Sequence, residues 1–382
     1  MKTKVAIVSC KDYERKNVLP AVAKCVDLCG GVASILKKDP HVFLKPNLLM
    51  AKPPEKATTT HPEIVFAVAS LLKEHSASMS MGDSPALGVY SNVLKKTGME
   101  KIAQELGISL VEFQESLSRK LPDGIFHLEL AKECLETSCL INLPKLKTHS
   151  QMLMTLAVKN LFGCVVGTRK VNWHFRSGID YHYFARLLVE ICLALKPAYN
   201  LVDGIIGMQG DGPNHGDPRA MGILVGGENP FAVDFVICRI VGIDPGELFT
   251  IKMARKMDVF GTREEEIDIV GESIENVYAK NFIRPKNHPL LFGPPFLRKS
   301  LRKHFTAKPL IVDSECKKCM ACQKICPAQA IYMKGENLQI SYQDCIRCFC
   351  CQEVCPHKAI LTQESKVLQI FKKFFPDYSG KA

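Results

Sequence analysis

Nine of the seventeen cysteines of this 382-residue chain lie close together near its C-terminal end. Eight of the nine repeat one spacing, Cys-x2-Cys-x2-Cys-x3-Cys-Pro, over residues 316–327 and again over residues 345–356. The flanking sequences IVDSECKKCMACQKICPAQAI and ISYQDCIRCFCCQEVCPHKAI align at an offset of 29 residues, which indicates an internal duplication. Two-residue gaps let a tight turn aim three thiolates at one metal centre, and the three-residue gap and proline redirect the fourth.

The duplicated spacing resembles that of a bacterial-type ferredoxin with two [4Fe–4S] clusters, in which the fourth cysteine of each run binds the other cluster. The resemblance implies one cluster on Cys316, Cys319, Cys322 and Cys355, and a second on Cys345, Cys348, Cys351 and Cys326. A zinc site would instead show paired Cys-x2-Cys knuckles separated by a longer loop. Cys350 fits neither set, and we expect it to be a small, partly buried bystander.

Polar side chains follow several predicted strands in the first 283 residues. They include Lys45, Asn47, Asp83, Asn142, Lys145, Lys147, His149, Asp203, Asp211 and His215. Open α/β sheets bind ligands at the carboxyl ends of their strands, so these residues are expected to share a ligand site. The alternative is that they serve only in turns and helix caps.

The stretch QMLMTLAVKNLFGCVV is nearly all apolar and is predicted to form a buried helix over residues 151–163. Gln151, Thr155 and Lys159 would then form one narrow polar stripe. Because a buried lysine must be paired or face a cavity, we expect Lys159 to meet an anionic substrate or a carboxylate such as Asp203. The alternative is that this polar stripe reaches solvent between neighbouring loops. Farther along, His174 is equally balanced between a functional and a structural role.

The candidate catalytic set has the chemistry to bind a carboxylate or a phosphate. It comprises Lys45, Asn47, Lys145, Lys147, His149, Lys159 and Asp203. Lys145, Lys147 and Lys159 would neutralise the charge of the substrate, and His149 could supply a proton. No phosphate-binding or dinucleotide-binding glycine motif occurs, so neither ATP nor NAD is indicated. A divalent metal held by Asp83, Asp203, Asp211 and His215 is the alternative use of these side chains.

The fold class follows from alternating strand-like and helix-like stretches, several of the strands being continuous apolar runs. We predict an α/β fold with a mainly parallel sheet covered by helices, plus a small α+β ferredoxin-like domain. The predicted strands are 4–10, 41–47, 77–83, 108–113, 139–145, 200–205, 221–227 and 267–272. The predicted helices are 17–30, 61–75, 88–106, 151–163, 180–196, 229–241 and 246–259.

The domain plan that we predict has four parts: an α/β domain (1–283), a basic proline-rich linker (284–310), a 2[4Fe–4S] domain (311–362) and a basic amphipathic tail (363–382). The formal net charge is +11. The linker alone holds seven basic residues and no acidic one, whereas residues 1–283 are nearly balanced. A nucleic-acid-binding protein would carry its basic charge on a folded face, so that class is not expected.

The sequence shows no run of about 18 apolar residues, so no membrane-spanning helix is expected. The first apolar run is too short for a signal peptide, and reduced thiols suit a cytoplasmic protein. The stretches PPFLRKSLRKHF and SKVLQIFKKFFPDY can form basic amphipathic helices. Such helices can lie on an anionic membrane, but we favour packing against the protein itself.

The motifs FLKPN, TTHPE, GDS, INLPKLKTH, VKNLFG, VDGIIGMQGDGP and AVDFV resemble, in this order, those of the family called domain of unknown function 362. The resemblance covers about residues 1–280, and members of this family often carry a ferredoxin module at one end. It implies an iron–sulfur protein and supplies no reaction.

Three functions are consistent with these features. The first is an oxidoreductase in which the clusters pass electrons to a small anionic substrate or cofactor. The second is a non-enzymatic electron carrier or assembly factor whose large domain docks a partner, and the third is a redox adaptor at a membrane surface. A redox partner protein is expected in each case.

Overall fold

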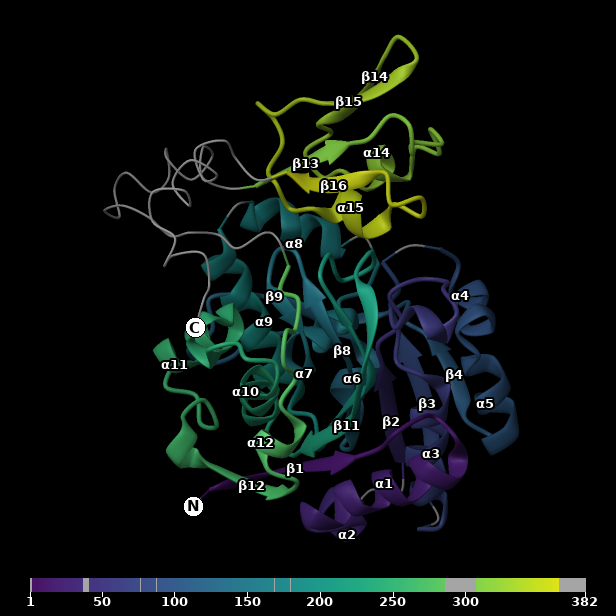
Figure 1. Cartoon of the computed structure of the whole chain (residues 1–382), viewed down its shortest axis with the longest axis vertical. Helices are drawn as coiled ribbons and strands as arrows, with labels where there is room; N and C mark the ends of the chain where they lie inside the picture. The colour runs from purple at the N-terminus through teal and green to yellow at the C-terminus, as the bar shows by residue number, and fades with distance from the viewer. Residues whose placement is uncertain are drawn as a thin grey trace.

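A computed structural model describes residues 2–36, 41–75, 77–86, 88–167, 169–178, 180–285 and 307–363. Within these ranges the chain forms a large unit, residues 2–285, on which a small unit, residues 307–363, is seated (Figure 1). Both of the predicted basic amphipathic helices, in PPFLRKSLRKHF and SKVLQIFKKFFPDY, lie outside the described residues.

The large unit is built on a mixed, mainly parallel sheet, as predicted. Its described strands run in the order β12, β1, β11, β10, β7, β2, β3, β4, while β8 pairs with β10 and with β9. Strand β11 runs antiparallel to both neighbours, and β9 runs antiparallel to β8. The strands are β1 Thr3–Ser9, β2 His41–Pro46, β3 Ser78–Asp83, β4 Ser109–Glu112, β7 Leu140–Leu143, β8 Lys145–His149, β9 Leu153–Thr155, β10 Tyr199–Gln209, β11 Asp217–Gly227 and β12 Ile267–Gly271.

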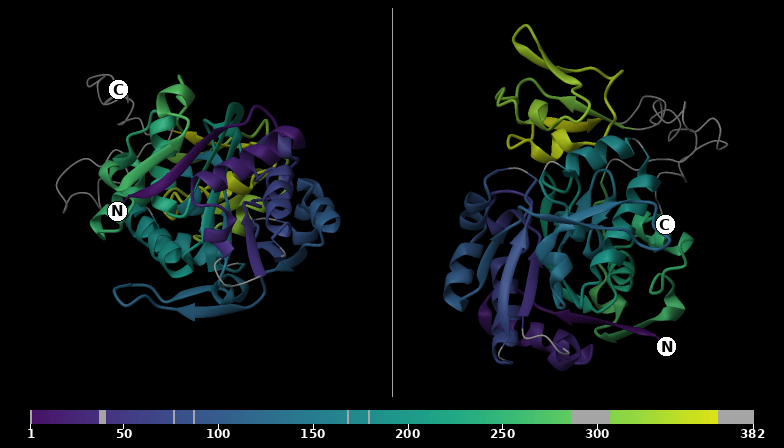
Figure 2. Two further views of the ribbon diagram at one scale, coloured as in Figure 1. Left: turned by 90° about the horizontal axis from the view of Figure 1, so that it is seen from below. Right: turned by 180° about the vertical axis from the view of Figure 1, so that it is seen from behind.

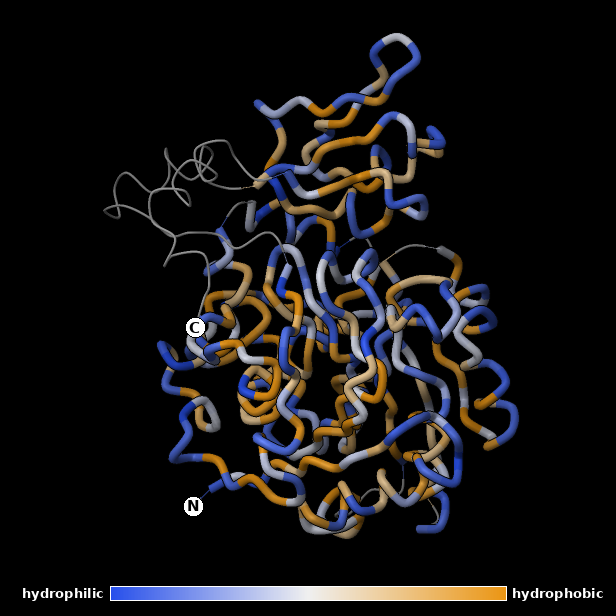
Figure 3. Tube along the Cα trace, viewed as in Figure 1, coloured by the Kyte–Doolittle hydropathy of each residue, from blue (hydrophilic) through white to orange (hydrophobic). Residues whose placement is uncertain are grey.

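Helices cover both faces of this sheet (Figure 2). In β2, Val42 and Leu44 join one core while Phe43 joins another, because successive side chains of a strand point to opposite faces. Hydrophobic segments accordingly run along the central strands (Figure 3). The first core includes α1 Arg15–Leu28, α3 Pro62–Lys73, α4 Tyr90–Thr97 and α5 Met99–Leu106; the opposite cores include α9 Tyr181–Leu195, α10 Pro230–Ile240 and α11 Phe249–Lys256.

Most predicted elements are present, but two helix predictions need correction. The predicted helix 88–106 is two helices, because Gly98 between them takes a left-handed φ of 78° that ends α4. The predicted helix 151–163 is wrong. Lys147–His149 pairs with Leu153–Thr155 as antiparallel strands, and only α7 Ala157–Asn160 and a 3-10 turn, Leu161–Cys164, follow.

The error over residues 151–163 has a physical cause. A short run of apolar residues is compatible with a buried strand as well as with a buried helix. Here the turn between β8 and β9 is held by the Ser150 hydroxyl, which donates to the Gly212 carbonyl at 2.8 Å. Gln151, Thr155 and Lys159 therefore lie on a turn, a strand and a helix, and not on one helical stripe.

The structure adds elements that were not predicted. They are α2 Val32–Leu36, β5 Ser116–Arg119, β6 Leu128–Ala131, α6 Lys132–Glu136, α8 Arg169–Ser177 and α12 Ile274–Val277. Helix α8 is important for the site because it lies directly under the small unit (Figure 1).

The small unit has the predicted α+β fold and repeats its backbone as well as its sequence. It contains two short antiparallel pairs and two short helices: β13 Lys308–Ile311 with β16 Ile360–Gln363, β14 Ile331–Lys334 with β15 Asn337–Ile340, α14 Ala321–Ile325 and α15 Cys350–Val354. Left-handed residues recur at an offset of 29: Lys318 and Arg347, Met320 and Phe349, Gln329 and Lys358. These positive φ angles make the tight turns that bring the cysteines of each run together.

Candidate functional site

The cysteines of the small unit surround two small cavities. One is lined by Cys316, Cys319, Cys322 and Cys355, and the other by Cys326, Cys345, Cys348 and Cys351, with Cys350 beside them. Each group takes three thiols from one run and the fourth from the other run. Thiolate sulfur is the usual ligand of iron–sulfur clusters, so four thiols around an otherwise largely apolar space fit a [4Fe–4S] cubane.

The two cysteine groups differ in exposure. Cys319 of the first group is exposed, whereas no cysteine of the second group is: Cys348 and Cys351 are buried, and Cys326 and Cys345 are partly buried. Helix α15, which carries Cys350 and Cys351, packs against the large unit (Figure 1). The second group is therefore the one next to the large unit.

Two of the candidate lysines form buried ion pairs. Lys45 Nζ lies 2.9 Å from Asp83 Oδ1, and Lys145 Nζ lies 2.7 Å from Asp203 Oδ2. The Tyr13 hydroxyl donates to the other oxygen of Asp203 at 2.7 Å, so both oxygens of this carboxylate have a partner. Asp203 is thus the partner of Lys145 and not of Lys159, and its charge is already matched within the fold.

A third candidate lysine, Lys147, is held by neutral acceptors. Its ammonium donates to Asn47 Oδ1 at 2.8 Å and to the Thr58 carbonyl at 2.7 Å. The Asn47 amide group in turn donates to Asn160 at 2.7 Å, and Asn160 donates to Asn142 at 2.8 Å. This chain of amides turns the oxygen of Asn47 toward Lys147, since an amide has one acceptor and one donor end.

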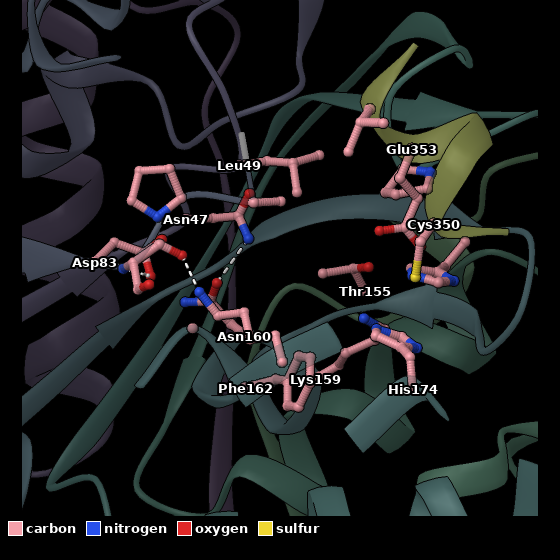
Figure 4. A pocket seen from close by; sticks show the side chains of 18 of the residues that line it. Asn47, Leu49, Asp83, Thr155, Lys159, Asn160, Phe162, His174, Cys350 and Glu353 are labelled. Atoms are coloured by element: carbon pink, nitrogen blue, oxygen red, sulfur yellow. Dashed lines mark hydrogen bonds and ion pairs between the residues drawn. The ribbon is translucent and has the colours of Figure 1, made fainter. Parts of the chain in front are cut away.

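A cavity of about 330 Å³ lies between the two units (Figure 4). The large unit contributes Asn47, Lys147, His149 and Lys159 of the candidate set, whereas Lys45, Lys145 and Asp203 do not line it. The small unit contributes Ile325 at the end of α14, and Cys350, Glu353 and Val354 of α15. Further lining residues that carry polar side chains are Asp83, Ser84, Thr155, Asn160, Lys170 and His174.

Three lysines reach this cavity without a carboxylate at ion-pair distance in the described ranges. Burial lowers the pKa of Lys147 well below its usual value, and the nearby Lys159 lowers it further. Burial also lowers the pKa of Lys159, although the attraction of Glu353 opposes the shift. Burial lowers the pKa of Lys170 to about 8. All three shifts have the same cause, which is an ammonium taken out of water with too little negative charge beside it.

His149 connects the large unit to Glu353 of the small unit. Its Nδ1 accepts the backbone N–H groups of Gln151 at 3.0 Å and Met152 at 3.2 Å, so the proton of the neutral ring is on Nε2. Nε2 lies 3.1 Å from Glu353 Oε1. Burial lowers the pKa of His149 to about 4, so the ring is neutral at physiological pH. Burial alone would raise the pKa of Glu353, but His149 and Lys159 lower it to about 2.

The loop after β10 also holds the small unit in place. The Asn214 amide donates to the Glu353 carbonyl at 2.7 Å, and His215 Nε2 lies 2.7 Å from the Cys355 carbonyl. His215 is therefore engaged with the small unit, while Asp83 and Asp203 are paired with lysines. In the described ranges no three His, Cys, Asp or Glu side chains are grouped to hold a single metal ion, so the alternative divalent site is not formed.

Two buried polar atoms at the small-unit end of the cavity have no hydrogen-bond partner among the described residues. They are Thr155 Oγ1 and His174 Nδ1. Buried polar groups in folded proteins are nearly always satisfied, by protein, water or a ligand. Both residues line the cavity, so their hydrogen-bonding capacity is left for water or a polar ligand.

Helix α8 brings two of the cavity residues into place. Lys170 and His174 lie one turn apart on one face of α8, next to Val171, and all three line the cavity. The His174 ring is packed between Phe162 and Phe184, with ring centroids 5.6 Å and 4.6 Å away. These aromatic rings orient an imidazole that has no polar partner of its own in the described part of the chain.

Sequence reasoning missed Glu353 and gave Cys350 no function. A signal for both was present in the duplication, because an offset of 29 matches Cys350 with Ala321 and Glu353 with Lys324. The two repeats therefore differ at the positions where α15 faces the cavity. Cys350 is buried, as expected in part, but it also lines the cavity.

Known proteins that are similar to this chain include a relative from Synechocystis sp. and a solved structure. A thylakoid-associated protein of Synechocystis sp. is 37% identical over 301 residues, which is 79% of this chain and 94% of that protein. The lactate racemase apoprotein from Thermoanaerobacterium thermosaccharolyticum is 12% identical with a TM-score of 0.43; the alignment covers 62% of this chain and 57% of that one. In the described ranges no helix is long and apolar enough to cross a membrane.

Two families match parts of the chain. Residues 308–356 match a 4Fe–4S dicluster domain, which supports an iron–sulfur electron-transfer role. Residues 42–239 match the family described as Domain of unknown function (DUF362). The second match spans the strand ends and the helices that line the cavity. Together with the identity to the Synechocystis protein over most of both chains, it shows that this protein belongs to the DUF362 family.

Proposed function

We propose that this protein is an oxidoreductase in which two [4Fe–4S] clusters exchange electrons with a small anionic substrate or cofactor in the cavity. The ligands of one cluster are Cys316, Cys319, Cys322 and Cys355, and those of the other are Cys326, Cys345, Cys348 and Cys351. Their grouping around two separate cavities supports this assignment.

The position of α15 is the observation that carries the proposal. Cys348 and Cys351, from the second cysteine group, stand on either side of Cys350 in the sequence, and Cys350 and Glu353 line the ligand cavity. A cluster in that group and a ligand in the cavity are then separated by little more than one side chain. A [4Fe–4S] cluster supplies or accepts electrons singly, and short separation favours the transfer.

The side chains of the large unit bind the anion and orient it. Lys147 and Lys159 neutralise its charge, while Ile325, Val354 and Leu49 exclude water from one side of the cavity. His149 is neutral and its proton faces Glu353, so it positions this carboxylate and is a poor acid. Lys159 is the better proton donor, since burial lowers the pKa of its ammonium.

An anaerobic redox titration tests this function. The clusters are reduced, excess reductant is removed, and fractionated small molecules are added while the visible absorbance of the clusters is followed. Recovery of absorbance with one fraction is expected, with loss of the effect in Lys159→Ala. The matched control is Lys24→Ala, on an exposed lysine of α1. No recovery with any small-molecule fraction would overturn the proposal.

The second candidate is an electron carrier or an assembly factor without a substrate of its own. Exposure of Cys319 supports it, because a partner protein can approach the first cysteine group from solvent. Both candidates need a redox partner protein at that exposed group. Recovery of the oxidised clusters with a protein fraction, but with no small molecule, would favour the carrier.

Contact with a membrane surface is a third proposal, supported by the basic composition of residues 284–310 and by the thylakoid association in the name of the Synechocystis relative. Co-sedimentation with anionic liposomes tests it. Binding that salt abolishes is expected if the basic segments contact lipid, and absence of binding at low salt would end the proposal.

A further inference from the structure

The charges around the cavity do not balance. Four lysines lie at or just behind its wall, namely Lys45, Lys147, Lys159 and Lys170, against two carboxylates, Asp83 and Glu353. The two histidines of the lining are neutral, because burial lowers the pKa of His149 and of His174 to about 4. Among the described residues, two positive charges are therefore left without a partner.

The excess charge is distributed over both ends of the cavity. Asp83 is matched by Lys45, and Lys170 lies at that end, where its ammonium donates to the Ser84 carbonyl. Glu353 balances one lysine at the other end, where Lys147 and Lys159 both lie near it. A buried ammonium without an anion must lose its proton or acquire negative charge beside it. A cluster in the second cysteine group would supply such charge only at the small-unit end, which leaves the Lys170 end for a ligand.

Hydrogen-bonding capacity at the small-unit end points to an oxyanion. Thr155 Oγ1 and His174 Nδ1 are buried, face the cavity and lack partners among the described residues; their residues are 4% and 6% exposed. The Lys159 ammonium lies beside them, 5.8 Å from the centre of the Phe162 ring (Figure 4). A cation with neighbouring hydroxyl and imidazole groups is suited to a carboxylate or a phosphate.

We propose that the ligand of this cavity is a small dianion, either a dicarboxylate or a phosphate monoester. One charged group is held by Lys159, Thr155 and His174 next to α15, and the remaining charge by Lys147 and Lys170. The inference deepens the proposed function, because it names the charge class of the substrate in the same cavity.

The proposal has a consequence that does not depend on redox activity. A dianion restores full protonation to the cavity lysines, so its binding takes up protons from solution at neutral pH. The ionisable groups that face these lysines are Lys45, Asp83, Lys145, His149, Cys164, His174, Cys350 and Glu353.

Calorimetry of the cluster-loaded protein under anaerobic conditions tests the proposal. Malonate and inorganic phosphate are the dianionic probes, acetate is the monoanion, and malonamide is the neutral analogue of malonate. Titrations in two buffers with different ionisation enthalpies give the number of protons taken up. We expect at least one of the two dianions to bind about tenfold or more tightly than acetate, with net proton uptake. Which dianion binds more tightly distinguishes a carboxylate from a phosphate ligand.

Three variants locate the binding site. Lys159→Met is expected to weaken the dianion about tenfold or more, and Thr155→Val by a smaller factor, whereas the surface control Lys24→Met leaves affinity unchanged. Binding of acetate or malonamide as tight as that of the dianions, no binding of either dianion, or unchanged affinity in Lys159→Met would each overturn the proposal.

The same data separate this proposal from the proposed function. Dianion binding with proton uptake, but without reoxidation of the clusters by any small molecule, would support the dianion site and overturn the proposed oxidoreductase function. Reoxidation of the clusters by a monoanionic compound, without dianion binding, would retain the oxidoreductase and overturn the dianion site.

Discussion

Lys145 and Lys159 belong to the same polar stretch of the large unit, yet the described structure gives only Lys145 a carboxylate at ion-pair distance. The Lys145–Asp203 pair is closed, since the Tyr13 hydroxyl donates to Asp203 and also accepts from Lys145 at 2.8 Å. Lys159 instead faces a cavity, with aromatic rings about 6 Å away. The difference teaches that lysines of one stretch serve either the fold or a ligand, depending on whether the fold itself supplies an anion.

The largest expected effect comes from breaking the closed pair. Lys145→Met leaves Asp203 buried without its cation and should lower the free energy of unfolding by about 3–5 kcal/mol. Lys159→Met removes an ammonium that has no anion, so it should change stability by less than about 1 kcal/mol or increase it. Urea unfolding followed by the fluorescence of the single tryptophan, Trp173, measures both. Equal losses in the two variants would remove the distinction between closed and open lysines.

The second prediction concerns pH. The pKa of Lys170 is about 8 in the folded protein, against about 10.4 for an unfolded chain. The unfolded state therefore binds more protons between these pH values, and stability rises with pH across this window. Relative to Lys170→Met, the wild type should gain up to about 3 kcal/mol of unfolding free energy from pH 8 to pH 10.4. A constant difference between the two proteins would show that Lys170 remains charged throughout.

The third prediction concerns the contact between the units. Glu353→Leu removes the carboxylate next to His149 and should weaken the seating of the small unit by about 1–3 kcal/mol. The effect is limited because Asn214 and His215 bind backbone carbonyls, which the substitution keeps. Hydrogen exchange of the backbone amides in residues 210–216 should become faster. Glu336→Leu, in the exposed turn between β14 and β15, is the control and should leave exchange unchanged.

The smallest effect is expected at Cys350. It lies outside the two sets of cluster ligands, so Cys350→Ala should retain the full iron and acid-labile sulfide content and cost about 1 kcal/mol of stability. Cys348→Ala should instead lose iron and part of the visible absorbance. Loss of a cluster in Cys350→Ala would assign this thiol to the ligands and would change the grouping proposed for the small unit.

Much of the small unit is predictable from sequence because its chemistry depends on local spacing. The C-x2-C gaps require tight turns, and the left-handed residues at Lys318 and Arg347 show that both repeats make them in the same way. In the large unit, alternation of apolar runs with helical stretches predicted a mainly parallel sheet with helices on both faces. The cysteine spacing and the alternation of strands and helices are both set by residues that are close together in the sequence.

The helix predicted over residues 151–163 shows where local patterns fail. Its apolar residues are buried, as predicted, but the sequence cannot distinguish a helix from a strand pair inside a core. The choice depends on β8, which pairs with β10 and so offers an edge to β9. That edge exists only after distant strands have assembled.

The sequence alone determined the cysteine spacing, the family motifs and the polar residues at the ends of strands, because these depend on residue type and order. Only the tertiary structure decided which lysines are paired and which face the cavity. Lys145 meets Asp203 because β8 lies beside β10, and Glu353 meets His149 because the small unit is seated on the large one. Pairing of charges far apart in the chain depends on packing, and packing has no signature in local spacing.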